Sequence, residues 1–413
     1  MGSTAITPAT LDEFVAETDR RGGPNTPGAA TYWATFSYRP SSAVDKATNP
    51  FSDAYAAQQL SLYNEIAGRA LDQQINKHTH FPVDTHVAAP NPYDHGTPSI
   101  LATHLLRLAG AFQLGGCVRD ARVLDMGCGW GLSSEIAAYL GFVVTAVDIN
   151  ADFVALVNRR AARLGARIKA VRSAFDSFET TEKFNAVLFY ECLHHAVRPW
   201  TLLARIREML APSGCIVLCG EPINEHWWPN WGLRLDPISV YSIRKFGWFE
   251  SGWSLNFIRR CLDLTGLETS VHVAENSDVG MTLIGRAQPE LPVNWLLRNA
   301  TIEGGTVEGP LIVTQGSLRI SFGSLWTPGD LTLIVDNHRP GPVEYKCRLD
   351  DRSLVEGTLH YGENRLLFEG VGSNGRIEIT SETWIPNDEI RNGDTGPIGF
   401  HIRGVCWRLH GPF

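Results

Sequence analysis

The sequence predicts an α/β core, preceded by an irregular or helical N-terminal segment and followed by an all-β domain. Between residues 97 and 288, apolar runs alternate with helical patterns, which predicts a mostly parallel sheet with helices on both faces. After Pro289, short alternating strands are separated by turn residues, which is typical of a β-sandwich. A chain of 413 residues is too long for one ordinary core. The predicted domains are therefore residues 1–96, 97–288 and 289–413.

The N-terminal segment is rich in glycine, proline and small residues up to about residue 50, and residues 21–28 read as a loop. A helical pattern runs from about Tyr55 to Ile66. Residues 78–95 are again loop-like, and we expect the N-terminal segment to form a cover over the site of the next domain. Scattered loop histidines are usually surface or pocket residues, so no metal site is predicted. The histidines concerned are His78, His80, His86 and His95.

The central region contains the apolar runs of a seven-stranded sheet. The predicted strands are residues 122–126, 143–147, 168–171, 184–190, 215–219, 268–273 and 281–287. Helices are predicted to begin near Leu132 and to span residues 151–164, 200–210 and 255–264.

The C-terminal region shows period-two alternation and little helix. The predicted strands are residues 311–313, 317–322, 331–335, 343–349, 364–369, 376–380 and 399–409. Residues 362–368, Gly-Glu-Asn-Arg-Leu-Leu-Phe, resemble an edge motif of jelly-roll carbohydrate-binding domains.

Composition excludes several classes of protein. A hydrophobic share of 44% and a charged share of 19% describe a folded soluble domain. The net charge of −8, without a basic run, argues against nucleic acid as the main partner. No apolar run is long enough to span a bilayer, and residues 1–10 lack the features of a signal peptide. The eight cysteines occur singly, which suggests neither a disulfide framework nor a zinc ribbon. We therefore expect a cytoplasmic protein.

A glycine-rich turn follows the first strand of the central region. Residues 125–131 read Asp-Met-Gly-Cys-Gly-Trp-Gly, and glycines let a ligand approach the backbone closely. The N–H groups that open the next helix favour an anionic group. Asp148 ends the second strand, where an acidic residue can bind a ribose diol. A dinucleotide fold would place its third glycine at Leu132, whereas here it is Gly131.

This D-x-G-C-G-x-G pattern with a later Val-Asp resembles the class I S-adenosylmethionine (SAM) methyltransferases. The resemblance covers roughly residues 98–287 and implies a Rossmann-like, seven-stranded core with SAM as cofactor. It implies that Asp148 binds the ribose, that Ile149 and Phe175 lie against the adenine, and that Asp176 accepts from the adenine amine. Tyr190 ends the fourth strand and is also expected at the cofactor. The residues expected at the methionine part are Asp125, Gly127, Cys128, Gly129 and Gly131.

The sequence after the fourth strand supplies candidate catalytic residues. By resemblance, this segment faces both cofactor and acceptor. A hydroxyl acceptor must lose a proton, and a histidine suits a general base. The candidates are His195 or His194, with Glu191 as the orienting partner and Glu221 as a second possible base. Alternatively, one histidine caps the local turn and Glu191 contacts SAM.

A long insertion after residue 221 is rich in aromatic residues, at 226–231 and 246–250. Such side chains with nearby carboxylates commonly hold sugars, but they also form hydrophobic seams of lids or dimers. The favoured interpretation is O-methylation of a hydroxyl on a sugar or another small molecule, and both a monomer and a homo-oligomer remain open.

Two alternatives remain open. Residues 127–131 also resemble cyclopropane fatty acid synthases, although this chain has Asp-Ile-Asn-Ala-Asp at 148–152, where those lipid-modifying enzymes carry a Thr-Leu-Ser run. The other alternative is a non-catalytic protein that binds a glycan or a partner on a methyltransferase scaffold.

Overall fold

The computed structural model describes residues 4–24, 26–72, 80–91, 97–274, 280–324 and 327–410. The chain forms two compact units. The first consists of Met1–Arg259 and Ser270–Ile284, and the second of Arg260–Thr269 and Gly285–Phe413. The boundaries 1–96, 97–288 and 289–413 remain a prediction.

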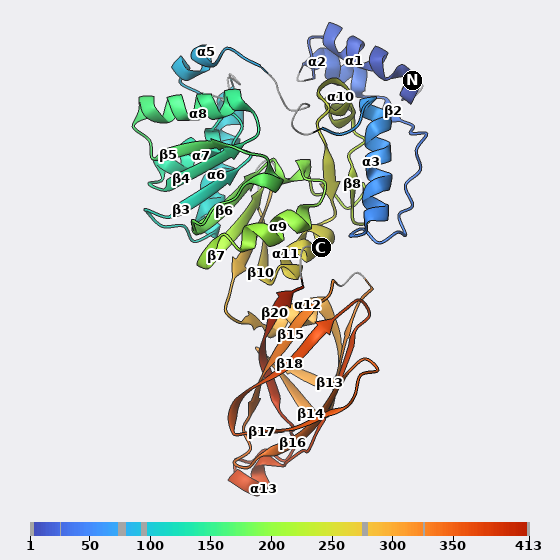
Figure 1. Ribbon diagram of the computed structural model, residues 1–413, viewed down its shortest axis with the longest axis vertical. Coiled ribbons are helices and arrows are strands. Elements are labelled where there is room, and N and C mark those ends of the chain that lie inside the picture. Colours follow the sequence, from blue (N-terminus) through green and yellow to red (C-terminus); the bar gives the residue numbers. More distant parts are fainter. Residues whose placement is uncertain are drawn as a thin grey trace. The chain divides into compact units, whose positions relative to one another are not determined.

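A seven-stranded sheet of order β10-β11-β7-β6-β3-β4-β5 confirms the predicted α/β core (Figure 1). The central strands β5, β4, β3, β6 and β7 pair in parallel, so their carboxyl ends meet at one edge. The strands are β3 (Arg122–Met126), β4 (Val143–Asp148), β5 (Ile168–Arg172), β6 (Phe184–Tyr190), β7 (Leu210–Cys219), β10 (Leu267–Val273) and β11 (Met281–Ala287).

Three helices cover one face of this sheet: α6 (Pro98–Leu114), α7 (Leu132–Tyr139) and α8 (Ala151–Leu164). Val144 and Ala146 of β4 point to that face, because alternate residues of a strand share a side. Val144 packs in a cluster with residues of α6 and α7, and Ala146 packs with Val157 of α8. Helix α6 was not among the predicted elements.

The helix predicted at residues 200–210 ends earlier than predicted. Helix α9 spans Pro199–Arg207, and the chain already enters β7 at Leu210. The pairing of β7 with β6 shifts after Phe184, and Ser213 takes a positive φ of 60° in the resulting bulge. The apolar residues up to Leu210 continue the helical pattern, so the sequence does not show that β7 begins at Leu210.

The N-terminal region contains more structure than predicted. Beyond the expected helix α3 (Asp53–Ala67), it forms β1 (Thr4–Ile6), α1 (Leu11–Arg20), α2 (Pro27–Trp33), β2 (Phe36–Tyr38) and α5 (Val83–Ala88). Leu11, Phe14 and Thr18 form the buried face of α1. Two short 3₁₀ turns, Phe175–Ser177 and Leu193–His195, belong to the α/β region that follows.

The aromatic insertion forms β8 (Trp231–Leu233), α10 (Pro237–Phe246) and β9 (Ser251–Trp253), which lie beside α3 (Figure 1). Trp231 is fully buried, and its indole donates to the carbonyl of Pro50 at 2.8 Å. The hydroxyl of Tyr55 donates to the carbonyl of Trp231 at 2.6 Å. Trp228 is also buried, whereas Arg234 lies over the ring of Trp227. Trp231 therefore joins the insertion to α3 and the residues before it, and buried Trp228 donates to the carbonyl of Leu233 within the insertion.

The second unit is built on one nine-stranded sheet, with β17-β16-β19-β14-β20-β15-β18 as its main path, and this supports the predicted β-sandwich. Strand β14 (Leu311–Phe322) joins two layers, since Ile312 and Val313 pair with β20 while Ser317–Ser321 pair with β19. Gly316, at φ +91°, lies between the two pairings. The other strands are β12 (Leu291–Pro292), β13 (Ala300–Glu308), β15 (Gly329–Asn337), β16 (Val343–Leu349), β17 (Val355–Leu359), β18 (Gly362–Val371), β19 (Arg376–Ser381) and β20 (His401–Leu409).

The second unit also includes helices α12 (Val293–Asn299) and α13 (Pro386–Ile390), and the segment Arg260–Thr269, which includes the end of α11 (Leu255–Leu264). Asp263 is buried and accepts from Arg298 at 3.3 Å and from Asn299 at 3.2 Å. The indole of Trp407 donates to the carbonyl of Leu264 at 2.9 Å. Residues well before Pro289 thus complete this unit.

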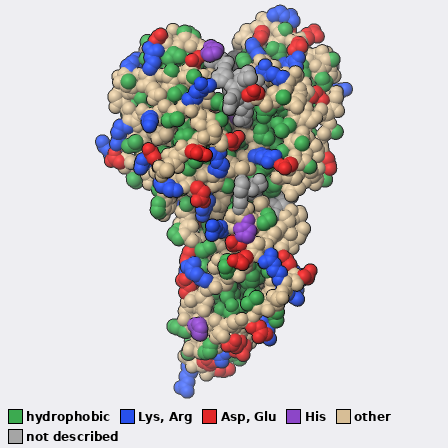
Figure 2. Space-filling model, viewed as in Figure 1, with side chains coloured by type: hydrophobic (Ala, Val, Ile, Leu, Met, Phe, Trp, Pro, Cys, Tyr) green, Lys and Arg blue, Asp and Glu red, His purple; other side chains and the backbone are tan. Residues whose placement is uncertain are grey.

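The surface carries charges of both signs, and the cysteines are unpaired. On the face in Figure 2, Lys and Arg side chains are interspersed with Asp and Glu side chains. All eight cysteines are free thiols. Among the described residues, no helix has both the length and the apolar character needed to span a membrane.

Candidate active site

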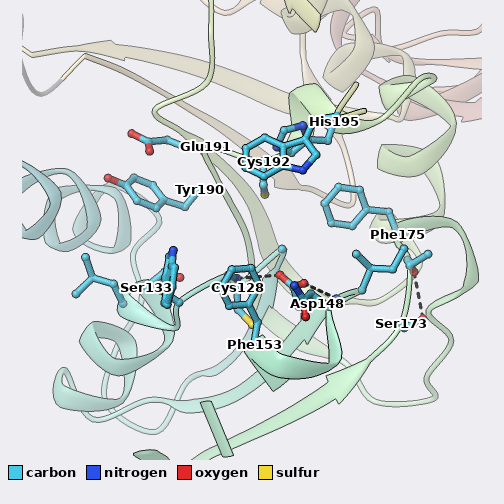
Figure 3. A pocket seen from close by; sticks show the side chains of 18 of the residues that line it. Cys128, Ser133, Asp148, Phe153, Ser173, Phe175, Tyr190, Glu191, Cys192 and His195 are labelled. Atoms are coloured by element: carbon cyan, nitrogen blue, oxygen red, sulfur yellow. Dashed lines mark hydrogen bonds between the residues drawn. The ribbon is translucent and has the colours of Figure 1, made fainter. Parts of the chain in front are cut away.

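A cavity of about 350 Å³ opens at the carboxyl ends of the parallel strands. Figure 3 shows Tyr190, Glu191, Cys192 and His195 along one side of the cavity, facing Asp148 across it. The predicted site residues that line it are Gly127, Cys128, Gly129, Asp148, Ile149, Phe175, Tyr190, Glu191 and His195.

The three glycines of the turn have different surroundings. All three have positive φ, which explains glycine at each position. A side chain at Gly129 would meet no atom within 4 Å, so this backbone is open to a ligand. A Cβ at Gly131 would lie 2.6 Å from Val157 of α8, and Gly131 does not line the cavity. Gly131 therefore allows close packing of α8 against the turn, rather than contacting the cavity as expected.

Asp148 is held rigidly at the end of β4. Its carboxylate accepts from the backbone N–H of Gly129 at 2.9 Å and from that of Asn150 at 2.8 Å. Each carboxylate oxygen has further acceptor capacity, so the group can also bind a diol. The position at the strand tip is the one predicted for ribose recognition.

Asp125 does not reach the cavity, contrary to expectation. It is buried within β3, and one carboxylate oxygen accepts from the hydroxyls of Ser133 at 2.7 Å and Ser134 at 2.5 Å. Burial raises the pKa of Asp125 to about 6, although both serines oppose the shift. Asp125 thus anchors the first turn of α7 under the glycine loop.

Tyr190 and Glu191 pair with helix α6. The Tyr190 hydroxyl contacts Nδ1 of His104, and Glu191 accepts from Arg107 at 2.7 Å. Burial raises the pKa of Glu191, and the nearby guanidinium of Arg107 opposes this shift. Glu191 therefore pairs with Arg107, whereas the prediction of an orienting partner required it to pair with His195. Glu191 has a positive φ of 51° and lines the cavity.

Glu221 anchors the 3₁₀ turn that carries both histidines, and it is not among the cavity-lining residues. Its carboxylate accepts from the backbone N–H groups of Cys192 at 2.9 Å, Leu193 at 2.8 Å and His194 at 3.2 Å. It also contacts Nδ1 of His194 at 3.0 Å. Burial raises the pKa of Glu221 to about 7, while the three N–H groups oppose the shift. This is the geometry of a positioning group, not of a base that meets an acceptor.

His195 lines the cavity with a defined tautomer. Its Nδ1 lies 2.8 Å from the carbonyl oxygen of Phe249. A carbonyl only accepts, so Nδ1 carries the proton and Nε2 the lone pair of the neutral ring. Buried Glu250 lies 3.9 Å from the same Nδ1 and 3.6 Å from Nε2 of His194. The sequence alone indicates Glu250 only as part of an aromatic insertion, because its proximity to the histidines depends on the tertiary fold.

The two histidines and Glu250 are also residue types that can bind a metal ion. His194, His195 and Glu250 each offer an atom within 4.8 Å of the others. Arg234 lies 3.7 Å from Glu250 and already brings a positive charge to this carboxylate. The histidines of the N-terminal segment are placed differently: His80 pairs with Asp152, while His78 and His95 lie outside the described residues.

Residues 123–214 match the family model described as "Methyltransferase domain". The match begins at β3 and continues to the β7 bulge, so it contains the glycine turn, Asp148 and the histidine pair. Residues 123–214 are therefore identified as a methyltransferase domain.

Two curated relatives are similar to part of this chain. The mitochondrial ubiquinone biosynthesis O-methyltransferase of Schizosaccharomyces pombe is 29% identical over 180 residues, which cover 38% of this chain and 64% of that protein. The ubiquinone biosynthesis O-methyltransferase of Xanthomonas axonopodis pv. citri is 36% identical over 100 residues, covering 24% and 42% of the two chains. This chain therefore spans less than two thirds of the length of either relative.

Among solved structures, the 1,6-didemethyltoxoflavin-N1-methyltransferase of Burkholderia thailandensis is 20% identical. The comparison covers 46% of this chain and 80% of the other, with a TM-score of 0.36.

A covering segment, residues 80–91, lies against α8 of the methyltransferase domain. Arg160 is buried, forms an ion pair with Glu135 at 2.5 Å, and donates to the carbonyls of His86 at 2.9 Å and Ala89 at 2.6 Å. Phe81 of this segment lines the cavity and packs on Trp130, with ring centroids 4.6 Å apart.

The structure places Asp176 elsewhere and adds cavity residues that the sequence analysis missed. Asp176 is exposed and lines a separate surface hollow with Arg205. The turn at 175–177 directs Phe175, but not Asp176, into the cavity. The missed residues are Phe81, Trp130, Leu132, Ser133, Asn150, Phe153, Cys192 and Trp248, and the cavity is also lined by Ser173 and Ala174 of the segment expected at the adenine.

Proposed function

We propose that this protein is a SAM-dependent O-methyltransferase that acts on a hydroxyl of a small molecule. The observation that carries the proposal is the cavity wall opposite Asp148, where His195 presents an acceptor nitrogen fixed by the carbonyl of Phe249. The names of the relatives, which are O-methyltransferases, support this class of reaction.

The residues present fit SAM. Gly129 leaves backbone open to the ligand, and Asp148 offers a fixed carboxylate for the ribose hydroxyls. Ile149 and Phe175 provide apolar surface for the adenine. When bound, SAM supplies an activated methyl group, while the protein positions the acceptor and excludes water. Burial raises the pKa of the Cys128 thiol well above its ordinary value, so this cysteine stays neutral and is not a nucleophile.

The proposed base is His195. When a hydroxyl oxygen is methylated, its proton must leave, and Nε2 of His195 is the group that would take it. The resulting imidazolium would keep its Nδ1–H on the carbonyl of Phe249 and would be stabilised by Glu250. His194 and Glu221 hold the turn that carries His195, so we assign them a positioning role.

The acceptor class is the finer part of the proposal. Aromatic rings at the cavity, including Trp130, Phe153 and Trp248, would accommodate either the C–H face of a sugar or a phenolic ring. We propose a sugar or sugar-bearing hydroxyl first, and phenols as the second class because the relatives are named for ubiquinone biosynthesis.

Cofactor binding is tested first, by calorimetric titration with SAM and with S-adenosylhomocysteine. Wild-type protein should bind both, and Asp148→Ala should lower the affinity by about 1–3 kcal/mol through loss of a charged hydrogen-bond partner. Asp120→Ala is the control, because it removes an exposed carboxylate that does not line the cavity. If folded wild-type protein binds neither compound, the enzyme proposal fails and the non-catalytic alternative is favoured.

The base is tested with acceptors identified by methyl transfer from labelled SAM to panels of sugars and phenols. His195→Gln should lower turnover by about 10²–10⁴-fold and leave SAM affinity near normal. It should also abolish the acid limb of the pH–rate profile, which a merely structural change would not do. His226→Asn, on the exposed surface, should behave as wild type. Loss of SAM affinity in His195→Gln would instead make His195 a cofactor-binding residue.

A further inference from the structure

Strand β18 (Gly362–Val371) is an edge of the nine-stranded sheet in the second unit. It pairs with β15 on one side, and no strand among the described residues pairs with its other side. An edge strand presents backbone N–H and C=O groups that can pair with another strand. Near the end of β18, Arg352 donates to the carbonyls of Glu369 at 2.6 Å and Gly370 at 3.3 Å, so the chain caps that end itself. The part of the edge left open is the start of β18.

The start of β18 is held in its extended form by contacts within the chain. Oδ1 of Asn364 accepts from the backbone N–H of His360 at 2.9 Å. Nδ2 of Asn364 donates to the carbonyls of His360 at 2.8 Å and Gly362 at 2.9 Å. The pairing of β18 with β15 then runs without a shift from Gly362 to Phe368. A second strand would meet an edge that is already ordered, so pairing would cost little conformational entropy.

The exposed side chains at this end of β18 differ in character from one to the next. Glu363 and Arg365 carry opposite charges and form an ion pair of 3.0 Å. Leu367 is 58% exposed, and Tyr361, directly before the strand, is 71% exposed. Glu363, Arg365 and Leu367 are two residues apart along the chain, so their side chains share one face of the strand. That face therefore presents an acidic, a basic and an apolar group in succession.

Antiparallel pairing of two β18 edges about Asn364 would bring complementary groups together. In such a pair, residues at equal distances from the two-fold axis lie opposite each other. Glu363 of each copy then faces Arg365 of the partner subunit, and Tyr361 faces Leu367 of the partner subunit. Opposite charges and apolar groups directly across two strands stabilise a sheet. Arg365 already contacts Glu290 at 2.5 Å, and it can keep this ion pair while it approaches a further carboxylate.

The other edge strands of at least five residues in the two large sheets lack this self-complementarity. Each carries charged Lys, Arg, Asp or Glu side chains of one sign only, so no symmetric pairing of two copies places opposite charges across from each other. Among these described edges, β18 is the one whose charges fit a second copy of the same strand. The charged residues of the other edges are Lys169 and Arg172 on β5, Glu268 on β10, Glu303 and Glu308 on β13, and Glu356 on β17.

We propose that β18 joins two copies of this chain by antiparallel pairing of their edges about Asn364. The nine-stranded sheets of the two copies would then continue across the interface. One strand edge buries less than the roughly 1,200 Å² at which standard stable interfaces begin, so we expect a concentration-dependent dimer with a micromolar dissociation constant. The proposal does not depend on the methyltransferase activity, because β18 lies in the second unit.

The test is sedimentation velocity of the full-length protein over a range of concentrations. Wild type should pass from monomer to dimer, and high salt should weaken the dimer by screening its ion pairs. Arg365→Glu makes the open edge acidic and Glu363→Arg makes it basic, so each variant alone should dimerise at least tenfold more weakly. A mixture of these two variants should form a heterodimer of about wild-type strength, because each supplies the charges that the other lacks.

A further variant and a matched control test the edge without changing its ion pairs. Leu367→Lys places a charge opposite Tyr361 of the partner subunit and should also weaken the dimer, because lysine on an edge opposes strand pairing. Val355→Lys is the control, since Val355 is 56% exposed on β17, at the other end of the same sheet. It should dimerise as wild type does. Thermal unfolding checks that each variant is folded, and SAM affinity should be unchanged in all of them.

Three results would overturn the proposal. One is wild-type protein that stays monomeric at every concentration. Another is a dimer that Arg365→Glu and Leu367→Lys leave intact, which would place the contact on another surface. The third is a mixture of Arg365→Glu and Glu363→Arg that does not associate, because pairing about Asn364 requires this recovery. None of these results bears on SAM binding, so this failure is distinguishable from failure of the enzyme proposal.

Discussion

At the scale of single residues, residues of the same type in one motif have different roles. Gly129 leaves backbone open to a ligand, whereas Gly131 leaves room for Val157. The spacing of glycines predicts a turn, but the packing partner of each glycine depends on a helix that follows in the chain. The same holds for Asp125, since its serine partners are fixed by the phase of α7. Asp148 was predictable because its position at a strand tip is a local feature.

The two glycines should respond differently to alanine. Gly131→Ala combines a positive φ with a contact of 2.6 Å, so the free energy of unfolding should fall by about 2–5 kcal/mol. Gly129→Ala should cost only about 1–2 kcal/mol of stability for its backbone conformation. It should nevertheless weaken SAM at least tenfold by filling open space at the cavity. Urea unfolding and calorimetry measure the two quantities, and equal stability losses would contradict this division of roles.

Asp125 should make stability depend on pH. Its pKa rises from 3.8 to about 6 on folding, so the folded protein binds an extra proton between these values. Stability therefore falls as pH increases through this interval. Asp125→Asn cannot ionise, so its unfolding free energy relative to wild type should increase by about 3 kcal/mol between about pH 4 and about pH 7.

The measurement for Asp125 is urea unfolding at several pH values. Asp120→Asn is the control, because Asp120 is 66% exposed and precedes the same strand. The control should show no such trend. A flat difference between Asp125→Asn and wild type would mean that Asp125 is ionised in the folded protein throughout.

At the scale of elements, the core strands were predictable and several helices were not. Apolar strands such as Phe184–Tyr190 can be predicted from their composition. Helix α1 was hidden because glycine, proline and small residues dominate the first 50 positions around it. Strand β13 contains a bulge at Gly304, which breaks the alternation that identifies a strand.

The covering segment at residues 80–91 should depend on Arg160. Lysine cannot reproduce the forked contacts of the guanidinium with Glu135 and the backbone carbonyls of the segment. In Arg160→Lys, loss of a charge-assisted hydrogen bond should raise the open population, and elastase cleavage near Val87, about tenfold. Arg167→Lys is the control, because Arg167 is 48% exposed and pairs with Asp120 outside the segment. Equal cleavage of both variants would show that Arg160 does not hold the segment.

At the scale of the whole molecule, the change of sequence pattern after Pro289 predicted a second unit but not all of its segments. Arg260–Thr269 belongs to that unit through long-range contacts, such as Asp263 with Arg298, and such contacts leave no local sequence pattern. The distribution of cavities was equally unpredictable, since His338 and His401 meet only across paired strands.

Asp263→Ala should destabilise the second unit selectively. It leaves Asn299 buried without its carboxylate partner, so the expected loss is about 2 kcal/mol. Hydrogen exchange followed by mass spectrometry should show faster exchange in peptides of residues 291–409 than in those of β3–β6. Asp351→Ala, on an exposed turn, should leave both sets unchanged. Faster exchange confined to the first unit would assign Asp263 to the wrong unit.

Strand β20 lies between β14 and β15 in the sheet, although it is the last strand to be synthesised among the described residues. While the ribosome is still making residues 401–409, β14 and β15 each lack this neighbour and present open edges. The second unit therefore cannot finish folding on the ribosome ahead of its final strand. A messenger truncated before that strand would yield a polypeptide with two unpaired edges, a substrate for chaperones and proteases rather than a smaller working protein.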